Sequence, residues 1–181
     1  AQNLPPLNPQ LTVTSTAISH ELLDRFLKIW PETPYVEYDP ENFDATYSSG
    51  GADHDVAIWN RYIPHLHFSA PMLDLISELC NELRDFTQMA LGHFVSFVNV
   101  RVYECRPGIK EDYFRWHSDV FPRPIKKIMV FLTPPSHEFG TMEIEVEGRR
   151  TLLEGIAGAA FLFDNNLTHR AVAPEGSRPR L

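Results

Sequence analysis

The chain has 181 residues, 43% hydrophobic and 22% charged. This is the ordinary mix of a globular protein that can bury a core without disulfides or a structural metal. Its 24 acidic and 16 basic side chains give a formal net charge of −8, which repels a phosphate backbone and argues against nucleic acid as a partner. The 15 prolines and 12% aromatic residues favour a β-rich fold over a helical bundle.

The two cysteines, Cys80 and Cys105, have no neighbour at the spacing of a metal or redox motif. A disulfide framework is therefore excluded as the source of stability, and two reduced thiols suit a cytoplasmic protein. No apolar run approaches the ~20 residues of a membrane span. Residues 1–9 have neither the basic start nor the apolar centre of a signal peptide. We therefore predict a cytoplasmic protein without a membrane partner.

An extended arm and an amphipathic helix are predicted first along the chain. Residues 1–16 are rich in Pro, Asn and Thr, and one short strand is expected at 11–14. The spacing of large apolar residues predicts a helix from Ser19 to Trp30, with Ser19 as its N-cap. Pro31 ends this helix because proline cannot continue the hydrogen-bond ladder.

A second helix is predicted from Ala70 to Leu91, with Gly92 as its C-terminal stop. The residues between the two helices, 35–69, are predicted to be irregular because polar and aromatic residues are mixed there without regular spacing. Part of this region, residues 43–62, is interpreted either as a lid that shields a reaction from water or as an ordinary surface loop.

Short strands are predicted from His93 onward. Five runs rich in β-branched and aromatic residues are separated by turns that contain Pro or Gly, and they span residues 94–103, 125–132, 141–146, 158–163 and 169–172. Without βαβ alternation, this order favours a β-sandwich or barrel packed against the two helices. We predict one domain, in which residues 1–92 supply the arm, helices and possible lid, and residues 93–181 form the barrel core.

The sharpest chemical signal is Trp116-His117-Ser118-Asp119. His117 and Asp119 are two residues apart, so on an extended segment both side chains project from the same face. They would occupy two adjacent corners of a metal octahedron, and His169, 52 residues downstream, can close that face. Two imidazoles and one carboxylate suit Fe(II) better than Ca²⁺ or a structural Zn²⁺. The sequence therefore predicts a metal site with the ligands His117, Asp119 and His169.

An arginine is predicted near this site. Arg178 is nine residues beyond His169, across a turn that contains Pro174 and Gly176, so a hairpin would return it to the neighbouring strand. A buried guanidinium is costly unless it meets an anion, and its planar fork binds a carboxylate through two hydrogen bonds. Arg180 lies on the same face of the strand, and both arginines are candidates.

Two stretches of the chain resemble the motifs of the prolyl-hydroxylase-like branch of the Fe(II)/2-oxoglutarate-dependent dioxygenases. Residues 98–108 followed by 116–119 look like the strand, turn and ligand signature of that branch. Residues 163–174 followed by 176–178 are similar to its second half. The resemblance covers about residues 94–181 and does not identify a substrate.

The resemblance implies a mainly β protein with supporting α-helices, built on a double-stranded β-helix (a jelly-roll or cupin-like fold). It implies Fe(II) on the triad, with 2-oxoglutarate and O₂ as cosubstrates. The distal carboxylate of 2-oxoglutarate would bind Arg178, which fits the spacing of the branch better than Arg180. Tyr103 is interpreted either as a hydrogen-bond donor to 2-oxoglutarate or as a core tyrosine. The implied activity is hydroxylation of a C–H bond in a small molecule, amino acid or peptidyl side chain.

Other interpretations stay open. His137 is a rival third ligand, although a single hairpin from Asp119 places it at the far end of a barrel. His65 and His67 alternate like a metal pair, but no carboxylate follows them, and a surface or packing role is simpler. A cupin-like metal dioxygenase without 2-oxoglutarate would keep the triad and need no inward arginine. A jelly-roll binding module would keep it as a vestige or for a structural ion.

Three further residues are interpreted by their position alone. Trp116 is expected to pack beside the metal, or else to line a substrate pocket. Lys126 and Lys127 are expected on a solvated face, although they also fit a rim that attracts an acidic substrate.

Overall fold

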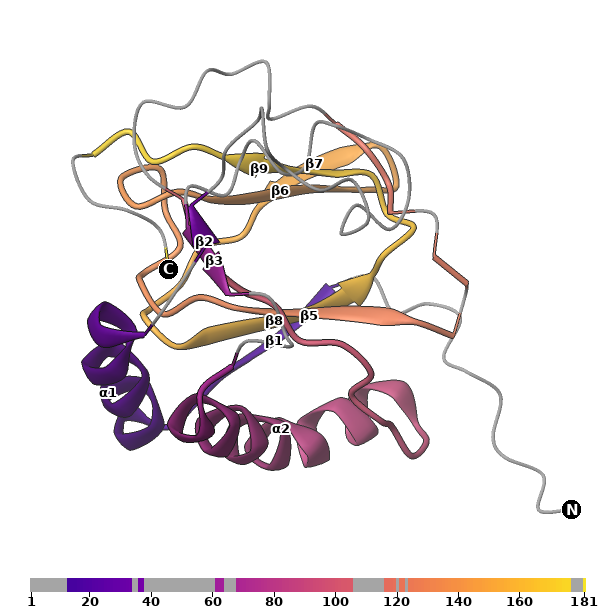
Figure 1. Ribbon diagram of the computed structural model, residues 1–181. Coiled ribbons are helices and arrows are strands. Elements are labelled where there is room, and N and C mark those ends of the chain that lie inside the picture. Colours follow the sequence, from indigo (N-terminus) through magenta and orange to yellow (C-terminus); the bar gives the residue numbers. More distant parts are fainter. Residues whose placement is uncertain are drawn as a thin grey trace, which may run out of the picture.

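The computed structural model describes residues 13–33, 36–37, 61–63, 68–105, 116–119, 121–122, 124–176 and 181. These residues form a mainly β protein with two α-helices and antiparallel sheets. Two three-stranded sheets lie one above the other, and both helices cover the outer face of the lower sheet (Figure 1). The predicted β-rich fold with helical support is therefore confirmed.

The lower sheet has the strand order β1-β8-β5 and is antiparallel throughout. Its strands are β1 (Val13–Ala17), β8 (Ala159–Asp164) and β5 (Lys126–Val130). The central strand, β8, is apolar on both faces because both are covered: Ala160 packs with the helices, whereas Phe161 and Phe163 belong to a cluster between the sheets. This two-sided burial explains its continuous apolar run.

The upper sheet has the strand order β7-β6-β9. Its strands are β6 (Thr141–Val146), β7 (Arg149–Leu152) and β9 (His169–Val172). Strand β7 was not predicted, because its first three residues are exposed and polar and gave no apolar pattern. The turn Glu147-Gly148, with φ values of 50° and 76°, joins it to β6. Positive φ at both positions matches the twist of a tight hairpin.

A third, smaller sheet joins β2 (Val36–Glu37), β3 (Arg61–Ile63) and β4 (Val102–Glu104) in that order. Strands β2 and β3 both lie within residues 35–69, the region predicted to be irregular. They are too short to produce a recognisable period in the sequence. The strand predicted at 94–103 is wrong for most of its length: only its last two residues lie in β4. Phe97 and Val100 there pack against the cluster that holds the helices, but within the described residues this segment is not paired as a strand. Its partial burial on one side therefore resembled the pattern of a strand.

The two helices confirm their predictions closely. Helix α1 (His20–Ile29) begins after Ser19, whose hydroxyl accepts a hydrogen bond from the Leu22 N–H, and the short 3-10 helix η1 (Trp30–Glu32) follows it. Helix α2 (Ala70–Leu91) is capped by Ser69 and stops at Gly92, which has the left-handed φ of 74°. Neither described helix meets the length and hydropathy that a bilayer crossing requires.

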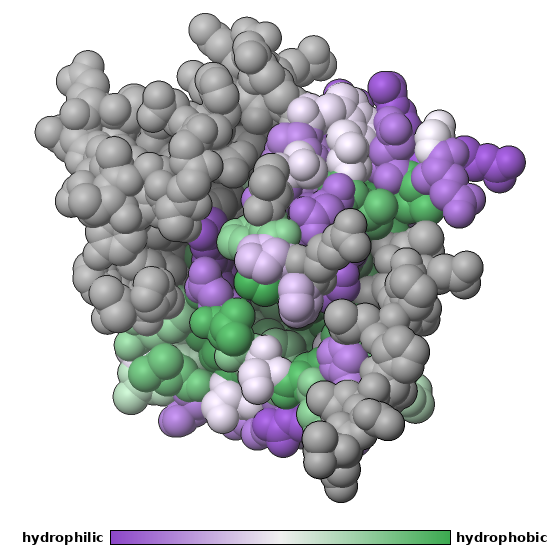
Figure 2. All heavy atoms as spheres, turned by 90° about the vertical axis from the view of Figure 1, so that its right-hand side faces the viewer, coloured by the Kyte–Doolittle hydropathy of each residue, from purple (hydrophilic) through white to green (hydrophobic). Residues whose placement is uncertain are grey.

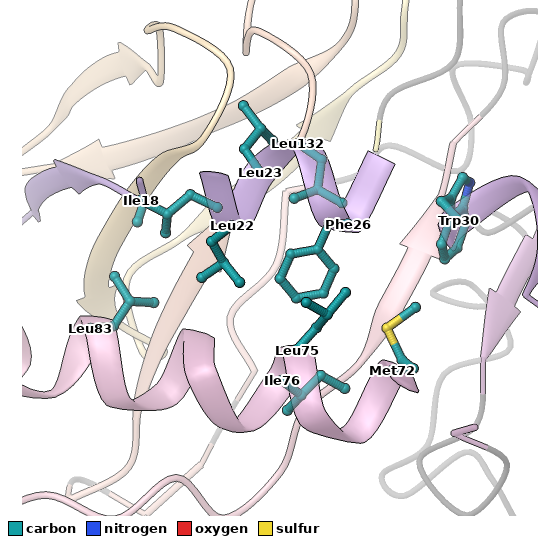
Figure 3. Packing of buried hydrophobic residues seen from close by; sticks show 11 residues of the cluster. Ile18, Leu22, Leu23, Phe26, Trp30, Met72, Leu75, Ile76, Leu83 and Leu132 are labelled. Atoms are coloured by element: carbon teal, nitrogen blue, oxygen red, sulfur yellow. The ribbon is translucent and has the colours of Figure 1, made fainter. Parts of the chain in front are cut away.

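The helices are held by a buried apolar cluster. Phe26 of α1 points toward Leu75 of α2, with Leu22 and Met72 on either side of this contact (Figure 3). Leu132, which follows β5, joins the same cluster and ties the helices to the lower sheet. The helix pair thus anchors the sheet that supplies one wall of the site described below.

Some apolar side chains remain outside both cores. Figure 2 shows apolar residues gathered over the lower part of the molecule when it is viewed from the right-hand side of Figure 1. Near the end of α2, the exposed fractions of Met89, Phe94 and Val98 are 82%, 85% and 77%. These residues contribute little to folding, so Phe94 serves below as a control for a buried phenylalanine.

Gly158 is predicted to be intolerant of alanine. Its φ is 85°, and an added Cβ would lie 3.1 Å from Cγ1 of Ile18. Gly148 has a φ of 76° but nothing within 4 Å of an added Cβ. In both variants the alanine has to adopt the left-handed conformation, which costs about 1–2 kcal/mol. Gly158→Ala should lower the free energy of unfolding by more than Gly148→Ala, as urea denaturation would measure. An equal loss in the two variants would contradict the close approach to Ile18.

Candidate metal site

The segment that carries His117 and Asp119 is fixed to the upper sheet by main-chain hydrogen bonds. The His117 N–H donates to the His169 carbonyl at 2.9 Å, and the His169 N–H donates to the His117 carbonyl at 2.8 Å. Two residues on, the Asp119 N–H donates to the Asn165 carbonyl at 3.1 Å. This pairing places His117 beside His169 although 52 residues separate them in the chain.

The three predicted ligands meet. One possible ligand atom from each of His117, Asp119 and His169 lies within 4.8 Å of the other two. Oδ1 of Asp119 is 3.8 Å from Nε2 of His117 and 3.7 Å from Nε2 of His169. Adjacent ligands of an octahedral ion bound at ~2.1 Å lie about 3 Å apart. The separations are slightly wider, so a bound ion would draw the three side chains together.

His169 is prepared for a ligand role by its surroundings. Its exposed fraction is 1%, and its ring meets the edge of the Phe163 ring at a centroid distance of 5.8 Å. Nδ1 lies 2.8 Å from the Leu167 carbonyl, an acceptor, which assigns the proton to Nδ1 and leaves a lone pair on Nε2. Burial, and then the nearby Lys127 ammonium, lower the pKa of His169 to about 4. A neutral imidazole is the form that binds a metal.

The turn between β8 and β9 supports two of the three ligands. Its carbonyl groups at Asn165 and Leu167 bind Asp119 and His169, as described above. Asp164 begins the turn by accepting from the Asn166 N–H at 2.9 Å and from the Lys126 ammonium at 2.5 Å. Burial alone would raise the pKa of Asp164, but these two donors outweigh it and lower the pKa.

Lys127 is a site residue that the sequence analysis placed wrongly on a solvated face. Its ammonium forms an ion pair with Oδ2 of Asp119 and lies 3.5 Å from Nε2 of His169. The signal was present in the predicted strand 125–132: Met129 and Phe131, at positions two and four beyond Lys127, both belong to the cluster between the sheets. Because side chains alternate along a strand, Lys127 must share their inward face.

Trp116 packs against two arginines of the upper sheet. The guanidinium carbons of Arg150 and Arg170 lie 4.8 Å and 5.2 Å from the centre of its ring. Arg170 also forms an ion pair with Glu143 at 2.6 Å. These cation–π contacts attach the residue before His117 to the upper sheet.

The other candidate site residues either lie apart from the triad or fall outside the described part of the chain. His137 lies 3.7 Å from Glu175 and does not join the triad, which is the one ligand cluster found among the residues that the structure describes. Tyr103 lies in β4 by its main chain, but its side chain, like Arg178, Arg180, His65 and His67, falls outside the described part of the chain. So does nearly all of the segment 43–62.

The pKa of His169 predicts a pH dependence for the metal-free protein. The imidazole of His169 is neutral in the folded state down to about pH 4, whereas the ordinary pKa of a histidine side chain is 6.5. Below pH 6.5 the unfolded chain takes up a proton that the folded one does not. As the pH is lowered from 6.5 to 4, the free energy of unfolding should therefore decrease, and this residue accounts for at most about 3 kcal/mol of the decrease.

Urea denaturation in EDTA at a series of pH values would measure this effect. In His169→Asn the profile should be flatter over the same interval than in the unchanged protein. The matched variant His137→Asn removes an exposed histidine and should keep the original slope. Equal slopes in the unchanged protein and in His169→Asn would contradict the depressed pKa.

Comparisons with known proteins bear on the fold. No protein-family model matches the chain, and no curated protein matches its sequence. The non-heme alpha-ketoglutarate-dependent epimerase SnoN from nogalamycin biosynthesis is similar in structure, with a TM-score of 0.64 at 13% identity over 94% of this chain and 75% of that one.

Two further solved structures are similar. EctD from S. alaskensis, solved with 2-oxoglutarate and 5-hydroxyectoine, has a TM-score of 0.62 at 18% identity, over 94% of this chain and 70% of that one. A prolyl-4-hydroxylase from Pseudomonas putida has a TM-score of 0.56 at 15% identity, over 94% of this chain and 89% of that one. The chain shares the fold of these proteins. The resemblance to Fe(II)/2-oxoglutarate-dependent dioxygenases predicted from the motifs is thereby confirmed for the fold.

Proposed function

We propose that the protein is an Fe(II)- and 2-oxoglutarate-dependent dioxygenase. The observation that carries the proposal is the convergence of His117, Asp119 and His169 within 4.8 Å. Two imidazoles and a carboxylate on one side of an ion are the ligands that non-heme Fe(II) oxygenases use. The shared fold with an alpha-ketoglutarate-dependent epimerase and with a protein solved with 2-oxoglutarate supports the same conclusion.

We propose further that the two facing sheets belong to a double-stranded β-helix, with residues 93–181 as its core. The support is the antiparallel pairing of both sheets and the position of the triad between them: His169 comes from the upper sheet, and its ring contacts Phe163 of the lower one. Residues 1–92 would supply the supporting arm and helices. A cytoplasmic location stays a prediction.

Each described residue of the site has a role in this proposal. His117, Asp119 and His169 would hold the iron, which together with 2-oxoglutarate and O₂ supplies the oxidising power to attack a C–H bond. Leu167 keeps the Nε2 lone pair of His169 directed into the site, and Phe163 excludes water from behind the ring. For the distal carboxylate of 2-oxoglutarate we propose Arg178, with Arg180 as the alternative, and Tyr103 as a hydrogen-bond donor.

The proposed reaction is hydroxylation of a small molecule, an amino acid or a peptidyl side chain. The support is the similarity to a prolyl-4-hydroxylase and to a structure that contains 5-hydroxyectoine. A cupin-like dioxygenase without 2-oxoglutarate, or a non-catalytic binding module, is less well supported, because two of the similar structures are described by their use or content of 2-oxoglutarate.

The proposal is tested by adding Fe(II) and then 2-oxoglutarate to the protein without oxygen. A weak visible absorption band that needs both components is expected, and admitting oxygen should release succinate. Arg178→Ala should raise the 2-oxoglutarate concentration required for half of the band, whereas Arg180→Ala should not. The opposite result would move the anchor to Arg180. If neither variant changes the requirement, or if no band forms, the role of 2-oxoglutarate is disproved.

A further inference from the structure

A lysine ammonium lies against the candidate metal site. Lys127 extends from β5 of the lower sheet, where it is paired with Phe163 of β8. Its Nζ contacts Oδ2 of Asp119, lies 3.5 Å from Nε2 of His169, and is 5.9 Å from the centre of the Phe163 ring. It reaches two of the three predicted ligands from the opposite sheet.

One of these contacts uses an atom that a metal ion would need, Nε2 of His169, and the other uses Oδ2, the second oxygen of the Asp119 carboxylate whose Oδ1 faces the two imidazoles. The ammonium group has three donors and no acceptor, so it can serve the Asp119 carboxylate and the Nε2 lone pair at once. The Asp119 side chain is 11% exposed and that of His169 is 2% exposed. A carboxylate so nearly buried is costly without a cation, and Lys127 provides that cation when no metal is bound.

We propose that Lys127 is an internal counter-ion that competes with the divalent metal for Asp119 and His169, so that metal binding displaces its ammonium. This inference rests on the proposed function, because it takes the triad as the metal site. A metal ion and an ammonium cannot both use the Nε2 lone pair, and two cations so close together repel each other. The lysine side chain is 29% exposed, and its flexible stem gives it a route out of the site.

The neighbouring lysine offers a matched control. Lys126 lies on the same strand and carries the same charge, but its ammonium binds Asp164 at 2.5 Å and, within the described part of the chain, forms no ion pair with Asp119. Removing either lysine changes the net charge of the protein by the same amount. A difference between the two variants therefore reports the direct competition at Asp119 and His169.

The test is calorimetric titration of the metal-free full chain with Mn(II), a divalent ion that does not react with oxygen. Lys127→Met should bind Mn(II) at least about tenfold more tightly than the unchanged protein, because no charge-assisted hydrogen bond has to be broken first, whereas Lys126→Met should stay within about twofold. Lys127→Gln provides a second variant if Lys127→Met folds poorly. Thermal unfolding gives a second readout: Mn(II) should raise the Tm of Lys127→Met by more than it raises the Tm of the unchanged protein.

Three results would overturn the inference. Unchanged or weaker Mn(II) affinity in Lys127→Met and Lys127→Gln would show that the ammonium does not compete. An equal gain in Lys126→Met would assign the effect to the general field. If Mn(II) binds neither the unchanged protein nor either Lys127 variant, the triad is not a metal site, and the proposed function fails together with the inference. The first two results would overturn the inference alone.

Discussion

Asp119→Ala is expected to abolish 2-oxoglutarate turnover and to weaken Mn(II) binding by at least about 100-fold. Even the loss of a residue that only hydrogen-bonds a metal ligand typically lowers metal affinity by about 10–100-fold. The carboxylate is the one anionic ligand of the triad, and its Oδ1 lies between the two imidazoles, 3.8 Å and 3.7 Å from their Nε2 atoms. Alanine would leave the Nε2 atoms of the two imidazoles with no anion between them. Metal affinity would be measured by calorimetry and turnover by succinate release.

The matched control for this prediction is Asp85→Ala on the exposed side of α2. The same side chain is removed there, far from the triad in the fold, and both affinity and turnover should stay unchanged. Asp119→Asn would keep the size of the side chain while removing its charge, and it should also lose most of the metal affinity. Succinate release by Asp119→Ala at the rate of the unchanged protein would disprove the triad as the metal centre.

Phe163→Ala is expected to lower the free energy of unfolding by about 3–5 kcal/mol, the usual cost of deleting a buried aromatic ring. Phe163 has no exposed surface and lies in the middle strand of the lower sheet, between Val13 of β1 and Lys127 of β5. Its ring also packs on His169. The substitution should therefore weaken Mn(II) binding as well, because the cavity removes a wall that holds the imidazole in place.

Chemical denaturation would give the loss of stability, with Phe94→Ala as the control. Phe94 is 85% exposed, so removing its ring should change the free energy of unfolding by no more than about 0.5 kcal/mol. Phe163→Leu retains most of the apolar volume and should fall between the two. A loss in Phe163→Ala as small as that in Phe94→Ala would contradict the packing between the sheets.

The sequence predicted those parts of the fold in which local chemistry and tertiary packing agree. Ser19 and Gly92 mark the ends of helices by their own hydrogen bonds and φ angles, so the helix limits were right to within a residue or so. Strands β6 and β9 were predicted with their observed limits. By contrast, β7 is polar because it lies at the exposed side of its sheet, and its pairing with β6 depends on partners that no local pattern reveals.

The site was predicted in part for the same reason. The spacing of His117 and Asp119 is local, and His169 follows a recognisable apolar strand, so the three could be grouped from the sequence. Lys127 could not be grouped with them by spacing, since its contacts cross from one sheet to the other. The alternation of side chains shows which of the two adjacent lysines faces inward, but only the pairing of β5 with β8 brings that face to the triad.

The turn from Asp164 to Thr168 has a consequence for how this centre can change. One carbonyl of the turn holds the main chain of Asp119, and another holds the ring of His169. A residue inserted there would displace both groups in concert, so neither can be adjusted without the other. Variation that alters the chemistry of the protein while preserving the triad is therefore expected away from this turn, and this short connection should tolerate almost no change in length.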